Sequence, residues 1–143
     1  MWGGAAGDEF SDGMSRGIRL IQLRHGNRID MIKVGYDQDG SRITGGQHGG
    51  NGGGKVQVAL DFPDEYLFQV SGTFDQTINS LIFFTRRKSN DERKQYGPFG
   101  KMHGNFFRSG AGRIVGFFGR AGKYLDAVGV YYEEPCRNRS LGS

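Results

Sequence analysis

Glycine-rich loops and short turns recur three times along this chain, and this repeat constrains the fold more than any other feature of the sequence. The loops are expected at Gly3–Gly7, Gly49–Gly53 and Gly97–Gly100, and the turns at Gly26–Asp30, Gly72–Gln76 and Gly122–Asp126. Equivalent positions lie about 47 residues apart, so the chain holds three copies of one supersecondary unit. Two of the three turns end in Asp, which suggests two copies of one binding site.

The composition favours ordered strands over disorder. Glycine accounts for 26 of 143 residues, but the chain has only 3 Pro and is 13% aromatic. Strands joined by tight turns with positive φ explain this combination. Short runs alternate polar and apolar side chains and are bounded by Gly, Asn, Asp or Pro. The expected strands are Ile18–Arg24, Ile29–Tyr36, Lys55–Phe62, Tyr66–Ser71, Ile78–Thr85, Ile114–Gly119 and Ala127–Tyr132.

These strands predict an all-β fold. No strand alternates with a long helix, which argues against an α/β chain. Three repeats of about four short strands allow three small sheets to turn their apolar faces toward one shared axis. Residues 1–135 are expected to form a single domain, followed by a polar tail over residues 136–143.

The net charge and the cysteine content limit which binding partners and which disulfides are expected. The net charge of +4 is only mildly basic, so nucleic acid is not expected as a partner. Cys136 is the single cysteine, which excludes an intrachain disulfide and leaves an intermolecular bridge open. Asn138 begins a glycosylation sequon that matters only in a secreted protein. No apolar signal segment or membrane span is expected, and the compartment stays open between the cytoplasm, for the chain as written, and secretion, for a processed form.

Two apparent ligand motifs are set aside. The loop Gly49–Lys55 matches the start of a phosphate-binding P-loop, but Val56 stands where Ser or Thr would hold Mg²⁺. An alternating strand follows where that motif needs a helix N-terminus. The three histidines, His25, His48 and His103, lack metal-ligand spacing. We therefore expect neither nucleotide binding nor a metal site, and no cofactor.

The pattern Gly-x-x-x-Asp occurs four times, and context separates two matches from ordinary turns. Gly26–Asp30 and Gly122–Asp126 fall in phase with the repeat and place an apolar residue before the Asp and a strand after it. Gly4–Asp8 and Gly35–Asp39 do neither. A carboxylate accepts from two adjacent hydroxyl groups, and successive backbone N–H groups in a tight turn donate to sugar oxygens. The two turns therefore suit recognition of a neutral polyol without a metal.

Catalysis finds little support in the sequence. Each candidate site has a single carboxylate, whereas glycoside hydrolysis needs a pair. No Ser or Thr has a His and Asp partner pattern, so an enzyme is not expected. The basic run Arg86–Lys88, within residues 85–95, is most simply a solvated loop. A polyanion such as a sulfated glycan or nucleic acid is the open alternative for that run.

Motifs spread over residues 2–134 resemble those of the jacalin-related lectins. They are Trp2–Gly4, Gly17–Arg19, Leu60–Leu67, Val70–Gly72, Tyr96–Gly100, Val115–Phe117 and Gly119–Tyr131. The resemblance implies a β-prism I fold, in which three four-stranded Greek-key antiparallel sheets form a pseudo-threefold repeat. It is stronger to the mannose/glucose-binding branch, because an intact loop precedes Asp8, whereas the galactose-binding branch is cleaved there.

The resemblance also implies the site residues. In that family the sugar lies between a glycine loop near the N-terminus and a Gly-x-x-x-Asp turn near the C-terminus. By position, the first site comprises Gly7, Gly122, Lys123, Tyr124, Leu125 and Asp126. Backbone N–H groups of Gly7, Lys123 and Tyr124 would donate to the sugar, and Asp126 would accept from its 4- and 6-hydroxyl groups. Ala6 replaces a customary glycine and is expected to restrict this loop.

A second site, known in some members of the family, is implied at the next repeat. It would comprise Gly26, Asn27, Arg28, Asp30 and Gly53. In the third repeat Gln76 stands where the other turns have Asp, so that turn is not expected to bind.

The sequence thus predicts a non-enzymatic, metal-independent lectin that binds mannose- or glucose-containing glycans and glycoproteins through two sites per chain. Such shallow sites typically bind in the mM range, about 4 kcal/mol. A homo-oligomer, dimer or tetramer, is therefore expected to supply avidity. The alternative is a protein-interaction or sulfated-glycan-binding domain on the same fold with weak or no mannose binding, which Ala6 and Arg86–Lys88 favour.

Overall fold

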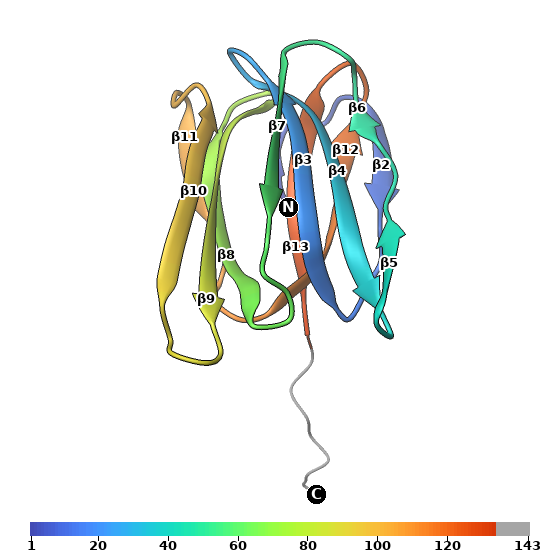
Figure 1. Ribbon diagram of the computed structural model, residues 1–143. Helices are drawn as coiled ribbons and strands as arrows, with labels where there is room; N and C mark the ends of the chain where they lie inside the picture. Colours follow the sequence, from blue (N-terminus) through green and yellow to red (C-terminus); the bar gives the residue numbers. More distant parts are fainter. Residues whose placement is uncertain (134–143) are drawn as a thin grey trace, which may run out of the picture.

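The computed structural model describes residues 1–133, in which every regular element is a β-strand (Figure 1). The strands are β1 (Trp2–Gly3), β2 (Asp8–Ser11), β3 (Gly17–His25), β4 (Ile29–Gln38), β5 (Ser41–Thr44), β6 (His48–Gly49), β7 (Gly54–Ala59), β8 (Glu65–Phe74), β9 (Ile78–Arg87), β10 (Arg93–Gly100), β11 (Asn105–Arg108), β12 (Ile114–Ala121) and β13 (Leu125–Tyr132). The predicted tail over residues 136–143, with Cys136 and the Asn138 sequon, lies outside the described residues. Among residues 1–133 no helix is long and apolar enough to cross a membrane.

The strands form three antiparallel sheets with one shared topology. Sheet A has the order β1-β13-β12-β2, sheet B the order β5-β4-β3-β7, and sheet C the order β10-β9-β8-β11. In each, a central hairpin is flanked by one outer strand on either side, which is the Greek-key order. β5 and β6 pair with successive stretches of β4 and share one strand position. The predicted all-β prism of three Greek-key sheets is confirmed.

Sheet A exists only because the two ends of the described chain meet. β1 pairs with β13, and β2 pairs with β12 on the other side of the same hairpin. The N–H of Gly4 also donates to the carbonyl of Asp126 at 2.9 Å. The loop that follows β1 is thereby held against the β12–β13 turn.

The inner faces of the three sheets meet in one core. Leu23 and Ile32 come from sheet B, Phe83 from sheet C, and Phe117 and Leu125 from sheet A, and all five are fully buried. Side chains alternate between the two faces of a strand, so each strand supplies apolar residues to one side. Burying each of these side chains contributes about 1.5–3 kcal/mol.

The three central hairpins turn at the same end of the prism, the upper end in Figure 1. In each turn the first residue donates its N–H to the carbonyl of the third at 3.0 Å: Gly26 to Arg28, Asp75 to Thr77, and Gly122 to Tyr124. The third turn therefore begins at Asp75 rather than at Gly72. The residue equivalent to Asp30 and Asp126 is Asn79, and not Gln76 as the sequence suggested.

The third glycine loop is shifted in the same way. Gly4, Gly50 and Lys101 each donate their N–H to the carbonyl of the Asp or Asn that ends the adjacent turn, at 2.9 Å in all three cases. The third loop is thus Gly100–Gly104, whereas the sequence suggested Gly97–Gly100. Glycine was a poor marker here because the third turn begins with Asp and its loop contains only two glycines.

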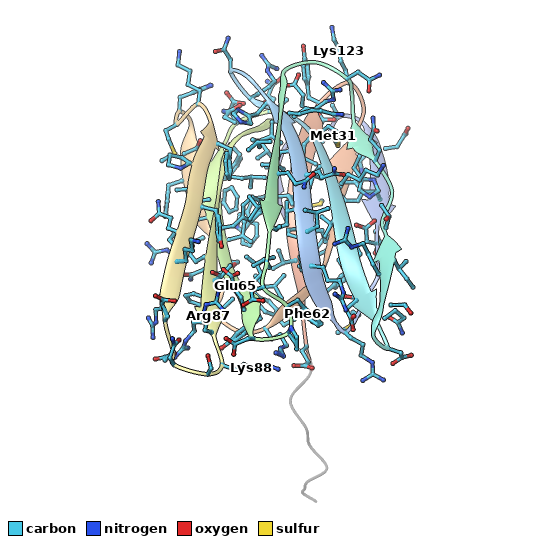
Figure 2. The ribbon with its side chains drawn as sticks, viewed as in Figure 1. Met31, Phe62, Glu65, Arg87, Lys88 and Lys123 are labelled. Atoms are coloured by element: carbon cyan, nitrogen blue, oxygen red, sulfur yellow. The ribbon has the colours of Figure 1, made fainter. Side chains whose placement is uncertain are left out.

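The basic run lies at the opposite end, where Figure 2 labels Arg87 and Lys88. The loop predicted over residues 85–95 is wrong at both ends, because Arg86 and Arg87 belong to β9 and β10 begins at Arg93. Arg86 pairs with Asp91, and Arg87 pairs with Asp61, each at 2.7 Å. Neighbouring carboxylates therefore compensate much of the charge of this run.

Beside the basic run, Glu65 is a buried acid tied to sheet C. Its carboxylate accepts from the hydroxyl groups of Thr85 and Tyr96, each at 2.7 Å, and from the N–H of Asp61 at 2.9 Å. Burial opposes ionisation of this group, but these hydrogen bonds outweigh it and lower the pKa of Glu65.

Candidate functional site

The first predicted site brings Asp126 against the loop that contains Gly7. Asp126 is only 5% exposed, and a Cβ at Gly7 would overlap its Oδ2 atom. Gly7 has a φ of 76°, a left-handed conformation that favours glycine. Only a residue without a side chain therefore lets the loop approach this carboxylate.

The Asp126 carboxylate has no hydrogen-bond donor or ion-pair partner among residues 1–133. Burial raises the pKa of Asp126, although the charges of Arg120 and Arg28 oppose this. The N–H groups of Gly7, Lys123 and Tyr124 likewise make no hydrogen bond with the described residues. One buried acceptor and several turn donors are thus free at one place.

Arg120 holds the first loop in position. Its Nη2 donates to the carbonyl of Gly7 at 2.8 Å, and its Nε donates to the carbonyl of Ala6 at 3.2 Å. Ala6 is not among the residues with positive φ, so the backbone at this position does not require glycine. Its effect on sugar binding at the first site stays a prediction.

The second predicted site repeats this arrangement in sheet B. Asp30 is 8% exposed, and a Cβ at Gly52 would lie 2.8 Å from its Oδ2 atom. None of the described residues donates a hydrogen bond to this carboxylate either. Gly53 has a φ of 74°, equivalent to that of Gly7. Arg24 donates from Nη1 to the carbonyls of Asn51 and Gly53 at 3.1 and 3.3 Å, as Arg120 does in the first loop.

The third repeat has the same backbone but satisfies its own polar groups. The side chain of Asp75 accepts from the N–H of Thr77 at 3.2 Å, which lowers the pKa of Asp75. The amide of Asn79 accepts from the Thr77 hydroxyl at 2.9 Å and donates to the carbonyl of His103 at 3.1 Å. The side chain equivalent to those of Asp30 and Asp126, and the N–H equivalent to that of Tyr124, are therefore occupied in the third repeat.

The histidines have structural partners. His25 Nδ1 accepts from the N–H of Gly100 at 3.2 Å, and His48 Nε2 lies 2.7 Å from a carboxylate oxygen of Asp12. In the part of the chain that the structure describes, no group of three or more His, Cys, Asp or Glu residues is placed to hold a metal ion.

Comparison with known proteins identifies the family. A model described as the jacalin-like lectin domain matches residues 1–131. The chain belongs to this family. Its members are carbohydrate-binding proteins without enzymatic activity.

Relatives and solved structures agree with this assignment. Jacalin-related lectin 3 and Jacalin-related lectin 19, both from Arabidopsis thaliana, are 42% and 40% identical to this chain. The matches cover 91% and 98% of this chain, but 22% of the first relative and 82% of the second. A mannose-specific jacalin-related lectin from Morus nigra, solved in complex with mannose, is 40% identical with a TM-score of 0.81. That likeness covers 90% of this chain and 88% of the other.

In this jacalin-like domain the first site opens into a hollow shared by all three turns. The hollow has a volume of about 430 Å³ and is lined by Asp126 and Tyr124 from the first site, Arg28 from the second turn, and Asp75 and His103 from the third repeat. The Arg28 guanidinium lies 4.4 Å above the ring of Tyr124. This stacking orients the aromatic ring at the edge of the site.

Not every predicted residue is placed to touch a ligand. Leu125 is fully buried and belongs to the core, so only its backbone position matters. Gly26 and Asn27 are exposed at the tip of the second turn, as the equivalent Gly122 and Lys123 are in the first site. The loop-holding arginines were missed by sequence reasoning, although a signal exists: Arg24 and Arg120 each stand two residues before the glycine of their turn.

Proposed function

We propose that this lectin domain, residues 1–135, binds mannose- or glucose-type glycans without a metal at two sites per chain. One site comprises Gly7, Gly122, Lys123, Tyr124, Leu125 and Asp126, and the other comprises Gly26, Asn27, Arg28, Asp30 and Gly53. The observation that carries the proposal is the pair of nearly buried carboxylates, each facing a glycine loop and each without a donor among the described residues.

A sugar fits these groups chemically. Adjacent hydroxyl groups would supply the donors that Asp126 and Asp30 lack, in charge-assisted hydrogen bonds. The free N–H groups of the loop and turn would donate to other sugar oxygens. The mannose complex of the Morus nigra relative supports mannose as the first ligand to test.

The third repeat supports two sites per chain rather than three. Asp75 and Asn79 use their side chains inside the protein, so a sugar there would have to break existing hydrogen bonds. Two open repeats and one closed repeat support two sites. Because each site is expected to bind in the mM range, we also propose a homo-oligomer, dimer or tetramer, as the form that provides avidity.

The test is a titration of the ¹⁵N-labelled chain with methyl α-mannoside, followed by the backbone amide signals of glycine. The amide signals of Gly7 and Gly53 are expected to shift until they saturate, and the signal of the equivalent Gly104 is expected not to change. Adding a chelator should leave both curves unchanged. Methyl β-galactoside serves as the control sugar and should cause smaller shifts.

Two outcomes would contradict the proposal. If neither Gly7 nor Gly53 responds to mannoside or glucoside, the protein belongs to the alternative class, a domain of the same fold with weak or no mannose binding. If Gly104 responds together with the other two, the assignment of two sites is wrong.

A further inference from the structure

A second hollow lies on the outer face of sheet B, and neither Asp30 nor Asp126 lines it. Its volume is about 330 Å³, within the range of ligand pockets, which is about 300–1,000 Å³. Figure 2 labels Met31, which lies on β4 toward the upper end of this face. Met31 is only 4% exposed and lines the hollow with apolar surface.

Two rows of paired residues cross strands β4, β3 and β7 beneath this hollow. Residues directly opposite one another on antiparallel strands share a face. One row is Lys33, Gln22 and Gln57, and the other is Met31, Arg24 and Lys55. All six residues line the hollow.

No carboxylate of the described residues pairs with the cations of these rows, although Arg24 donates to the carbonyls of Asn51 and Gly53. Arg24, Lys33 and Lys55 contribute three positive charges, and no carboxylate lines the hollow. Within residues 1–133 none of the three forms an ion pair with Asp or Glu. Arg24 and Lys55 stand directly opposite each other, an arrangement that destabilises a sheet. An anion bound between them would remove this repulsion.

Neutral donors lie beside the cations. Gln22 donates from Nε2 to Gln57 Oε1 at 3.1 Å, which leaves the amide nitrogen of Gln57 as a donor. Gln47 donates to Asn51 Oδ1 at 3.2 Å, which leaves the amide nitrogen of Asn51 as a second donor. Cations, amide donors and an apolar floor together match a sugar ring that carries an anionic group.

We propose that this hollow binds the sulfate group of a sulfated glycan. A sulfate presents three terminal oxygens in different directions, which suits cations that approach from three strands better than a planar carboxylate does. The basic run at the other end is less suitable, because Arg86 and Arg87 are already paired with carboxylates. The proposal goes beyond the mannose sites, since neither Asp30 nor Asp126 takes part, although Arg24 and Asn51 also belong to the loop contacts of the second mannose site.

The test compares two charge-matched double variants. Lys33→Gln with Lys55→Gln removes two cations from the hollow, whereas Lys88→Gln with Lys94→Gln removes two from sheet C and its loop. The probe is a heparin-derived hexasaccharide, titrated by calorimetry and by the side-chain amide signals of Gln22 and Gln57. Two control ligands are titrated in the same way: the desulfated hexasaccharide, which lacks sulfate, and an oligogalacturonate of equal length, which carries carboxylates instead.

We expect the first variant to raise the dissociation constant of the sulfated probe about tenfold, and the second to raise it about twofold or less. The desulfated probe and the oligogalacturonate should bind at least tenfold more weakly than the sulfated one. Binding should weaken with added salt, since exposed charges are screened.

Several results would overturn this inference. Equal losses in the two variants would mean that net charge alone attracts the probe. Equal binding of the oligogalacturonate would show a general anion site, and equal binding of the desulfated probe would show that sulfate is not recognised. The mannoside titration of Gly7, whose site shares no residue with the hollow, should be the same in both variants, so failure here is separate from failure of the mannose proposal. Thermal unfolding of each variant is the check that it is folded.

Discussion

Replacing Asp126 by Asn should remove sugar binding at one site without unfolding the protein. The carboxylate is nearly buried, faces Gly7 and accepts no hydrogen bond from the described residues. Its role, if the proposed function is right, is to accept from two sugar hydroxyl groups. Each hydrogen bond to a charged group contributes about 1.5–3 kcal/mol. Loss of two such bonds is at least about 3 kcal/mol, or more than a hundredfold in affinity.

From a starting affinity in the mM range, such a loss places the site beyond detection. The stability should change little, because a buried amide is less costly than a buried carboxylate without a donor. We expect the unfolding free energy of Asp126→Asn to stay within about 1 kcal/mol of the parent chain. Asp126→Asn should therefore lose mannoside affinity while its free energy of unfolding stays nearly unchanged.

The assay is the mannoside titration followed at individual glycines, with urea unfolding on the same sample. In Asp126→Asn the Gly7 signal should stop responding while Gly53 still responds, and Asp30→Asn should give the reverse. Asp39→Asn is the matched control, because Asp39 ends a Gly-x-x-x-Asp match outside the repeat phase and is exposed. Persistent saturation of Gly7 in Asp126→Asn would refute the reasoning, as would a loss of several kcal/mol of stability.

Two further predictions follow from polar groups described above. Asn79→Asp should not create a third site, and it should lower the free energy of unfolding by about 1–3 kcal/mol, because the new carboxylate would face the carbonyl of His103 without a donor between them. Urea unfolding measures the loss of stability. Mannoside-induced shifts at Gly104 would contradict the prediction. On acidification, burial raises the pKa of Asp126, so its ionised form and the Gly7 response should be lost as pH falls through a value above 3.8. The pKa of Glu65 is lowered below 4.5, so its stabilisation is complete above that value and lost only at lower pH. Mannoside titration and circular dichroism across this range measure the two losses separately, and a Gly7 response that persists below pH 3.8 would contradict the prediction for Asp126.

Alternating runs predicted the long central strands, because a buried inner face requires a period of two. The short outer strands were missed. β1 and β6 contain two residues each, and β2, β5 and β11 contain four. Runs this short carry no periodic signal, and their pairing depends on the neighbouring hairpin. β10 was missed for another reason, since it contains Gly97 and Pro98, which are typical of loops.

The sequence alone determined the all-β class, the threefold repeat and the two turns that end in Asp, because local periodicity and turn residues encode them. The tertiary structure decided which repeats are open. It placed Asn79, not Gln76, at the third equivalent position, and hydrogen bonds from Thr77 and to His103 close that repeat. It also brought Asp126 against Gly7 by pairing the first strand with the last. Such relations join residues far apart in the chain, and only the folded backbone sets their distance.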